Sequence, residues 1–130
     1  MKKPVENLEK RKVTGGRRRP HRGRRKHEKD GYPIETELGS VLLVKRRVRG
    51  GGIKLGLKRG DYANVTDPET KETKKVKILK VIANPASRDY ERRGVITKGA
   101  IIRTELGDAR VTSRPSQHGI INAVLIKKTS

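Results

Sequence analysis

Arginine and lysine are the residues of this sequence whose number and spacing indicate a chemical role, the binding of anions. They are densest in Thr14–Lys29, TGGRRRPHRGRRKHEK. A guanidinium group offers a planar fork of donors that matches phosphate oxygens. The stretch has no large aliphatic or aromatic residue and is broken by Gly and Pro, so it cannot bury a core. A charge run is usually a solvated face, but a run this dense repels itself until a polyanion neutralises it. We interpret it as an arm that lies along phosphates.

Residues suited to catalysis or metal binding are scarce. His21 and His27 lie in the basic arm, where phosphate contact or solvation is the simpler interpretation, and His118 is isolated in a polar stretch. There is no Cys, no HExxH pattern and no nucleophile beside a base. Gly50–Gly52 followed by Lys54 lacks the spacing of a P-loop and suits a hairpin turn. We expect no enzymatic activity, no cofactor, no metal and no small-molecule substrate.

Charge favours nucleic acid as the partner. The 130 residues carry 34 Lys and Arg against 14 Asp and Glu, a net charge of +20. Residues 1–33 hold thirteen of these cations and four of the acids, so the remainder is basic but more dilute. An anionic membrane is the weaker alternative, because the basic run lacks the apolar face of an interfacial helix. No apolar run is long enough for a span or a signal peptide, and the absence of Cys suits the cytoplasm.

The elements that must position these cations are predicted to be short strands. We expect strands at 41–49, at 53–58, where Ile53, Leu55 and Leu57 alternate with a cationic face, and at 62–65. A type I turn at 67–70 leads to a strand at 73–83 with a bulge near Ile78. Further strands are expected at 95–106, interrupted near Lys98, at 109–113 and at 120–126, the last one central.

Turns and one helix complete the prediction. Asn84 is expected to cap a single helical turn that begins at Pro85 and is ended by Gly94. Gly107–Asp108 is expected to be the two-residue turn of a hairpin, and 114–119 a polar loop. The predicted fold is all-β, a small antiparallel β-barrel or sandwich with an aliphatic core and an extended basic N-terminal arm. The predicted organisation is an arm at 1–33 that is disordered when free, a barrel-like domain at 34–126 and a tail at 127–130.

The scarcity of aromatic residues decides the expected mode of binding. The sequence has three Tyr and no Phe or Trp, so it cannot build the stacking platform of a single-strand reader. No helix is long enough to enter a major groove. The remaining mode of binding is recognition of the phosphate backbone and of shape, as on a folded RNA.

Three stretches together resemble a known family: Thr14–Glu28, VRGGGIK at Val48–Lys54, and the long run from Asn84 to Ile126, NPASRDYERRGVITKGAIIRTELGDARVTSRPSQHGIINAVLI. They are similar to the small-subunit ribosomal protein eight of archaea and eukaryotes, and the compact length resembles the archaeal form. The resemblance covers roughly residues 14–126. Gly52 departs from the Asn usual there, His21 and His27 replace the usual aromatics, and residues 1–12 align with nothing.

The resemblance implies a structural protein of the small ribosomal subunit in the cytoplasm, with ribosomal RNA and neighbouring ribosomal proteins as partners. Its implied RNA contacts are basic residues of the arm, of the strand before the glycines and of the segment before Gly94; together with the other candidates from the same basic stretches they are Arg17, Arg18, Arg19, His21, Arg22, Arg24, Arg25, Lys26, Lys29, Arg46, Arg47, Arg49, Lys54, Arg92 and Arg93. The alternatives are a ribosome biogenesis factor that shares the C-terminal domain, whose longer helix-rich N-terminal half is missing here, and a stand-alone RNA chaperone.

Overall fold

The chain divides into two compact units, residues 1–33 and residues 34–130. The structure, a computed structural model, describes residues 10–19, 22–23, 25–28 and 31–128. In the first unit Arg11 and Arg17 form an isolated antiparallel bridge around a turn, and Lys26–Glu28 form a 3-10 turn, η1. Both features are local, and the expectation that residues 1–33 are disordered when free stays a prediction. The side chains of this unit whose exposure is described are all exposed.

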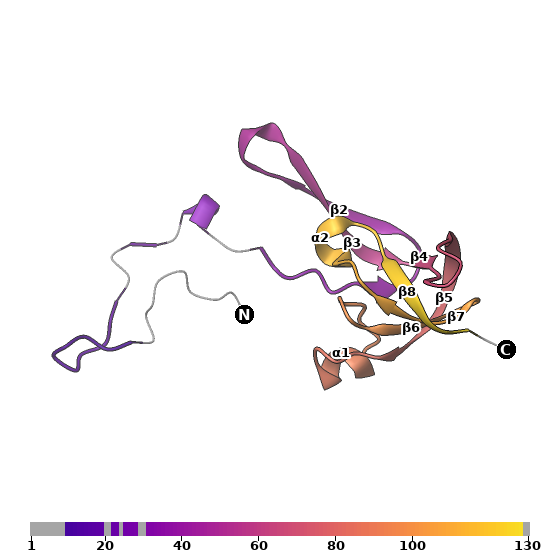
Figure 1. Cartoon of the computed structure of the whole chain (residues 1–130). Coiled ribbons are helices and arrows are strands. Elements are labelled where there is room, and N and C mark those ends of the chain that lie inside the picture. Colours follow the sequence, from indigo (N-terminus) through magenta and orange to yellow (C-terminus); the bar gives the residue numbers. More distant parts are fainter. Residues whose placement is uncertain (1–9, 20–21, 24, 29–30, 129–130) are drawn as a thin grey trace. The chain divides into compact units, whose positions relative to one another are not determined.

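The second unit is built on a closed five-stranded barrel (Figure 1). Its strands, in the order of their pairing, are β4 (Tyr62–Thr66), β5 (Thr73–Ala83), β6 (Ile101–Thr104), β7 (Gly107–Val111) and β8 (Asn122–Lys128). β8 pairs with both β7 and β4, so the prediction that it is central is confirmed. Closure leaves no free edge along these strands, which removes the usual risk of edge-to-edge aggregation.

The residues that precede the barrel strands in the sequence form a smaller, three-stranded sheet. Its strands, in spatial order, are β1 (Glu37–Leu38), β3 (Ile53–Gly60) and β2 (Leu42–Arg47). The short 3-10 turn η2 (Arg49–Gly51) joins β2 to β3. The predicted all-β fold with a barrel is confirmed. The expectation of purely antiparallel pairing is wrong at two of the described pairs, because β4–β8 and β1–β3 are parallel.

The core is aliphatic, as the composition predicts. Side chains alternate along β7, where Ala109 and Val111 are buried while Arg110 is exposed. The buried apolar cluster comprises Leu57, Ala63, Val65, Val76, Ile78, Ile96, Ala100, Ile102, Ala109, Val111, Ile121, Ala123 and Leu125. The register shift predicted in β5 is present between Ile78 and Lys80, where β5 pairs with β6. The barrel strands therefore supply most of this core, and Leu57 of β3, Ile96 and Ala100 of the β5–β6 connection and Ile121 before β8 supply the rest.

Three strand predictions are wrong in detail. The segment from Val95 to Ala100 is a loop that buries Val95, Ile96 and Ala100 and is fixed by the hydrogen bond from the Ile96 N–H to the Thr36 carbonyl at 2.7 Å. Only Ile101–Thr104 is strand. The hairpin turn lies at 105–106, two residues before the predicted Gly107–Asp108. The register places Arg103 opposite Asp108, and their ion pair, with Nε to Oδ1 at 2.9 Å, favours this turn.

The third strand error concerns the apolar face of β3. We expected Ile53, Leu55 and Leu57 to face a core, but only Leu57 is buried, whereas Ile53 is 64% exposed and Leu55 40%. The reason is that the outer half of the β2–β3 hairpin extends past the barrel (Figure 1). At the other end of the domain, β8 continues to Lys128, beyond the predicted start of the tail.

The helix prediction is displaced and incomplete. α1 spans Arg88–Arg92 and is capped by Ser87, whose hydroxyl accepts from the Asp89 N–H at 3.2 Å. Asn84 is buried and does not cap α1. Its Oδ1 accepts the Ala86 N–H at 3.0 Å and so closes a non-helical turn at Pro85, while its Nδ2 donates to the Val95 carbonyl at 2.8 Å. Gly94 ends the helical segment with a φ of +66°, as predicted. A second short helix, α2 (Pro115–His118), occupies the stretch predicted as a polar loop.

Among the described residues, no helix has the length and apolar composition required to cross a membrane.

Candidate nucleic-acid interface

The outer half of the β2–β3 hairpin is the most uniformly cationic element of the second unit. Between Glu37 and Asp61 the sequence contains seven Lys and Arg and no acid. Five of these side chains lie at the far end of the hairpin, and we call them the cationic ribbon: Lys45, Arg46, Arg47, Arg49 and Lys54. All five are exposed.

The strand register brings these cations together. Arg46 lies directly opposite Lys54, and Arg47 lies opposite Ile53. Directly opposite residues of an antiparallel pair project to the same face, and like charges in that arrangement destabilise the pair. A bound anion would reverse this effect. The ribbon therefore has the arrangement of a phosphate-binding surface.

The turn between the two strands lets a ligand approach the backbone. Gly50 and Gly51 have φ values of +79° and +81°, a region that side chains other than Gly rarely adopt. The Val48 N–H donates to the Gly52 carbonyl at 2.8 Å and closes the loop. No atom would lie within 4 Å of a Cβ at Gly50 or Gly51, so the tip is open. The prediction of a hairpin reversal at the three glycines is confirmed.

The arm cations are exposed where they are described. Arg17, Arg18, Arg19, Arg22, Arg25 and Lys26 all have exposed side chains. The predicted contacts His21, Arg24 and Lys29 lie outside the described residues. The arm belongs to the first unit and the ribbon to the second, so each is a separate candidate surface.

Arg92 and Arg93 differ from the ribbon because acidic side chains surround them. Arg93 is hydrogen-bonded to Glu35 and to Asp89, the latter with Nη1 to Oδ2 at 3.2 Å, and Arg92 binds Asp89 at 2.9 Å. The bond to Glu35, followed by the one to Asp89, raises the pKa of Arg93. The bond from Arg93 is the main cause that lowers the pKa of Asp89. Arg93 thus ties α1 to the segment before β1, whereas the Arg92 side chain remains 81% exposed.

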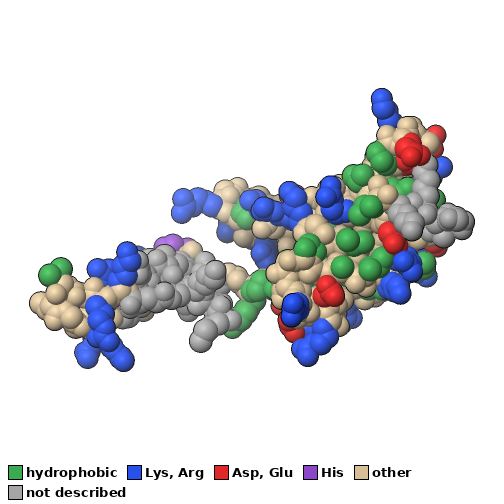
Figure 2. Space-filling view, turned by 60° about the horizontal axis from the view of Figure 1, so that its bottom comes forward, with side chains coloured by type: hydrophobic (Ala, Val, Ile, Leu, Met, Phe, Trp, Pro, Cys, Tyr) green, Lys and Arg blue, Asp and Glu red, His purple; other side chains and the backbone are tan. Residues whose placement is uncertain are grey.

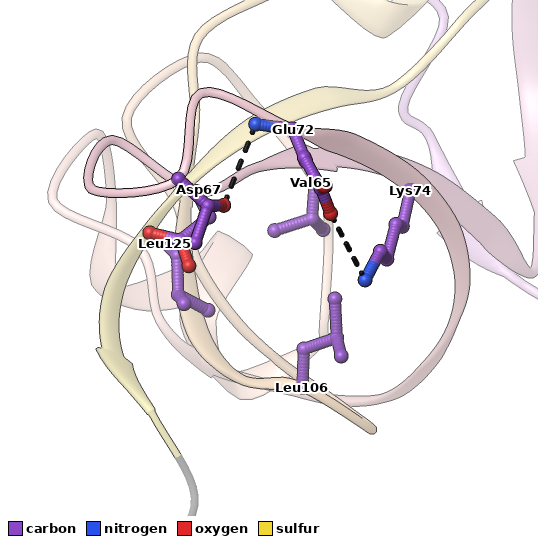
Figure 3. A pocket seen from close by; sticks show the side chains of 7 residues that line it. Val65, Asp67, Glu72, Lys74, Leu106 and Leu125 are labelled. Atoms are coloured by element: carbon purple, nitrogen blue, oxygen red, sulfur yellow. Dashed lines mark hydrogen bonds and ion pairs between the residues drawn. The ribbon is translucent and has the colours of Figure 1, made fainter.

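The opposite charge gathers around a hollow of about 200 Å³ at one end of the barrel (Figure 3). Val65, Leu106 and Leu125 provide apolar lining, and Asp67 and Glu72 come from the β4–β5 loop. Glu72 forms an ion pair with Lys74 at 3.2 Å, which Figure 3 shows. These carboxylates make this end of the barrel a poorer surface for a polyanion than the cationic ribbon. In the face seen in Figure 2, Asp and Glu likewise form small groups among more widespread Lys and Arg.

Sequence reasoning missed two features of the second unit. Lys45 is not among the predicted contacts, although it is two residues from Arg47 in the same basic strand end. The three Tyr residues are too scattered in sequence to predict a role, but Lys75 Nζ lies 4.9 Å from the ring centre of Tyr62 in a cation–π contact. Among the described residues, no group of three or more His, Cys, Asp or Glu is arranged to hold a metal ion.

Comparison with known proteins agrees with the resemblance noted in the sequence. The family model described as "Ribosomal protein S8e" matches residues 6–126, so the match begins earlier than the residue 14 expected. Proteins named "Small ribosomal subunit protein eS8" are 53% identical in Sulfurisphaera tokodaii (91% of this chain, 93% of the relative) and 54% identical in Hyperthermus butylicus (92% and 89%). The relative of that name in Nanoarchaeum equitans is 44% identical over 98% of this chain and its own whole length. An exposed cationic hairpin on a small β-barrel, a dense basic arm and these similarities over almost the whole chain lead to one assignment: the chain belongs to the Ribosomal protein S8e family.

Proposed function

We propose that this protein is a structural constituent of the small ribosomal subunit in the cytoplasm, where it binds ribosomal RNA and supports translation. The observation that carries the proposal is the cationic ribbon, five exposed cations on a hairpin segment without a single acid. The names of the curated relatives support the assignment to the small subunit. Neighbouring proteins of the subunit are the further partners that we propose.

Binding is proposed to rely on phosphate and shape rather than on stacked bases. Arg forks and Lys ammonium groups bind phosphate without an aromatic platform. Tyr62, the one aromatic side chain in the barrel strands, already has Lys75 against its ring. The proposed contacts are the arm residues Arg17, Arg18, Arg19, His21, Arg22, Arg24, Arg25, Lys26 and Lys29, the ribbon residues with Arg46, Arg47, Arg49 and Lys54 among them, and Arg92 with Arg93.

The two parts of the chain have different proposed roles. Residues 34–126 form the rRNA-binding domain, and residues 1–33 form an arm that is disordered when free and becomes ordered on RNA. The abrupt change from a glycine-broken basic run to alternating apolar residues after Pro33 supports this division. We propose no catalytic role and no cofactor, in keeping with the structural character of a ribosomal protein family.

Sedimentation of a cell lysate tests the function. We expect the protein to travel with small subunits and with translating ribosomes. Presence on immature particles alone would instead identify a biogenesis factor, and presence in the free fraction would identify a chaperone or an enzyme. A variant with Gln in place of all five ribbon cations should shift toward the free fraction, while its thermal unfolding stays close to that of the parent.

A further inference from the structure

A groove of about 790 Å³ lies between the cationic ribbon and α2. The proposed function explains the cations of the hairpin wall but gives no role to the polar residues of the α2 wall. Arg46, Val48, Lys54 and Leu55 line it from the hairpin. Ser116, Gln117 and His118 line it from α2. One wall is cationic with an apolar base, and the other is neutral and polar.

Close backbone packing holds the two walls at a fixed separation. A Cβ on Gly56 would lie 2.5 Å from the Ser116 carbonyl oxygen and 2.7 Å from Ile34 Cδ1, so α2 rests directly on β3 at this glycine. Gly119 ends α2 with a φ of +77°, and a Cβ there would lie 3.3 Å from Leu55 Cβ. The groove is therefore a consequence of packing and exists before any ligand enters.

On the α2 wall, a backbone hydrogen bond determines which ring nitrogen of His118 can donate to a ligand. Its Nδ1 accepts the Arg114 N–H at 3.2 Å, which leaves the ring hydrogen on Nε2. The neutral ring can donate from Nε2, and the Gln117 side chain, which is exposed, can both donate and accept. This wall has the chemistry to bond a ribose hydroxyl or a base edge, and it adds no charge.

We propose that this groove receives one unpaired nucleotide of an RNA strand, with its phosphate on Arg46 and Lys54 and its sugar or base edge on Gln117 and His118. The inference rests on the proposed RNA-binding function and adds a defined subsite to it. An unpaired nucleotide fits better than a duplex, because the polar groups of an unpaired base and its sugar are free to meet both walls at once. The like-charged pair Arg46 and Lys54 favours an anion at the first wall.

Two synthetic RNA hairpins test the subsite: one carries a single bulged nucleotide and the other is the same hairpin fully paired. In the full-length protein, Gln117→Ala combined with His118→Asn removes the proposed contacts, and Asn still offers an oxygen to the Arg114 N–H. We expect affinity for the bulged hairpin to fall about tenfold and affinity for the paired hairpin to stay unchanged. Ser40→Ala, which also removes an exposed neutral polar group, is the matched control and should change neither affinity.

A direct readout is the His118 ring signal in the proton spectrum of the unchanged protein, assigned by its absence in His118→Asn. It should shift on addition of the bulged hairpin and much less on addition of the paired one. An equal fall in affinity for both hairpins would overturn the single-nucleotide subsite, as would a shift produced by a poly-glutamate peptide but not by RNA. Unchanged affinity for both hairpins, with normal binding by the parent, would overturn the subsite and leave the proposed function intact. Failure of the parent to bind either RNA would overturn both.

Discussion

Two hairpins of the same domain treat charge in opposite ways. The β2–β3 hairpin has five exposed cations at its outer end and no acid in its sequence, and its apolar residues Ile53 and Leu55 are exposed. The β4–β5 hairpin mixes acids with cations, since Glu72 pairs with Lys74, and the Asp67 carboxylate is held in the loop by the Glu69 N–H at 2.9 Å. Its strands contribute Val65, Val76 and Ile78 to the core.

The difference teaches that stability and binding reside on separate elements. The β4–β5 hairpin is completed by its own barrel, whereas the ribbon places the like charges of Arg46 and Lys54 directly opposite each other, an arrangement that a polyanion would stabilise. If this is correct, changes to the ribbon alter RNA affinity and leave folding unchanged, and changes to the barrel do the reverse.

The largest expected effect comes from neutralising the ribbon. Replacement of Lys45, Arg46, Arg47, Arg49 and Lys54 by Gln should lower the slope of log affinity against log salt by about 0.7–0.9 for each phosphate that the protein no longer neutralises. If all five cations bind phosphate, affinity for small-subunit rRNA at physiological salt falls on the order of a thousandfold. Filter binding over a salt series measures this.

The matched control neutralises five exposed cations elsewhere on the domain: Lys77, Lys80, Arg88, Lys98 and Arg110. It produces the same change in net charge and should have a clearly smaller effect on the slope. Equal slopes for the two variants would show that binding depends on net charge alone and would remove the distinction between ribbon and barrel.

The second effect is on stability. Ile102 on β6 is completely buried, so Ile102→Ala should lower the free energy of unfolding by about 2–5 kcal/mol. Ile53→Ala, the same change at a side chain that is 64% exposed on the ribbon, is the control and should cost far less. Urea unfolding of both variants compares them. A similar decrease at the two sites would mean that the ribbon shares the cooperative core.

The third effect is also on stability and concerns the contact between β3 of the β2–β3 hairpin and α2. Gly56→Ala should force α2 away from β3, because the new methyl group would meet the Ser116 carbonyl oxygen. We expect a decrease of about 1–3 kcal/mol in the free energy of unfolding. Gly16→Ala, in the first unit, is the control, since its Cβ would have 3.8 Å to the nearest atom. Unchanged unfolding of Gly56→Ala would show that α2 is loosely held.

The smallest effect concerns pH. Arg93 lowers the pKa of Asp89 below its ordinary value of 3.8, so the stabilisation from this pair is fully present above that pH and is lost as pH falls through the lowered value. Arg93→Gln should move the Asp89 titration back toward 3.8, as followed by carboxyl carbon signals. Arg103→Gln, which affects Asp108 instead, should leave the Asp89 titration unchanged.

Much of the barrel could be predicted from the sequence because its signals are local. Turn residues bracket β5, and the alternation of its apolar residues predicts both its bounds and its bulge. The exposure of Ile53 and Leu55 could not be predicted in this way. An alternating strand specifies an apolar face, but whether another element covers that face depends on tertiary structure.

In the candidate site, too, the features with a local sequence signal could be predicted and those that arise from packing could not. Clusters of Arg and Lys identify the arm and most of the ribbon from composition alone. The α2 wall was missed because a helix of four residues has no periodicity, and the proximity of His118 to Lys54 across the groove arises only from packing. Likewise, nothing local indicates that Arg93 binds Glu35, 58 residues away.

Amide hydrogen exchange of the full-length protein, free and bound to small-subunit rRNA, tests the central claim most directly. We predict that amides of the buried barrel residues Ile102, Ala109 and Val111 exchange slowly in both states. Amides of residues 45–54, the segment that carries the cationic ribbon, should exchange fast in the free protein. Their exchange should become much slower when RNA is bound. Equal protection of the ribbon in both states, or RNA-dependent protection confined to the β4–β5 loop at residues 67–72, would contradict the assignment of binding to the ribbon and stability to the barrel.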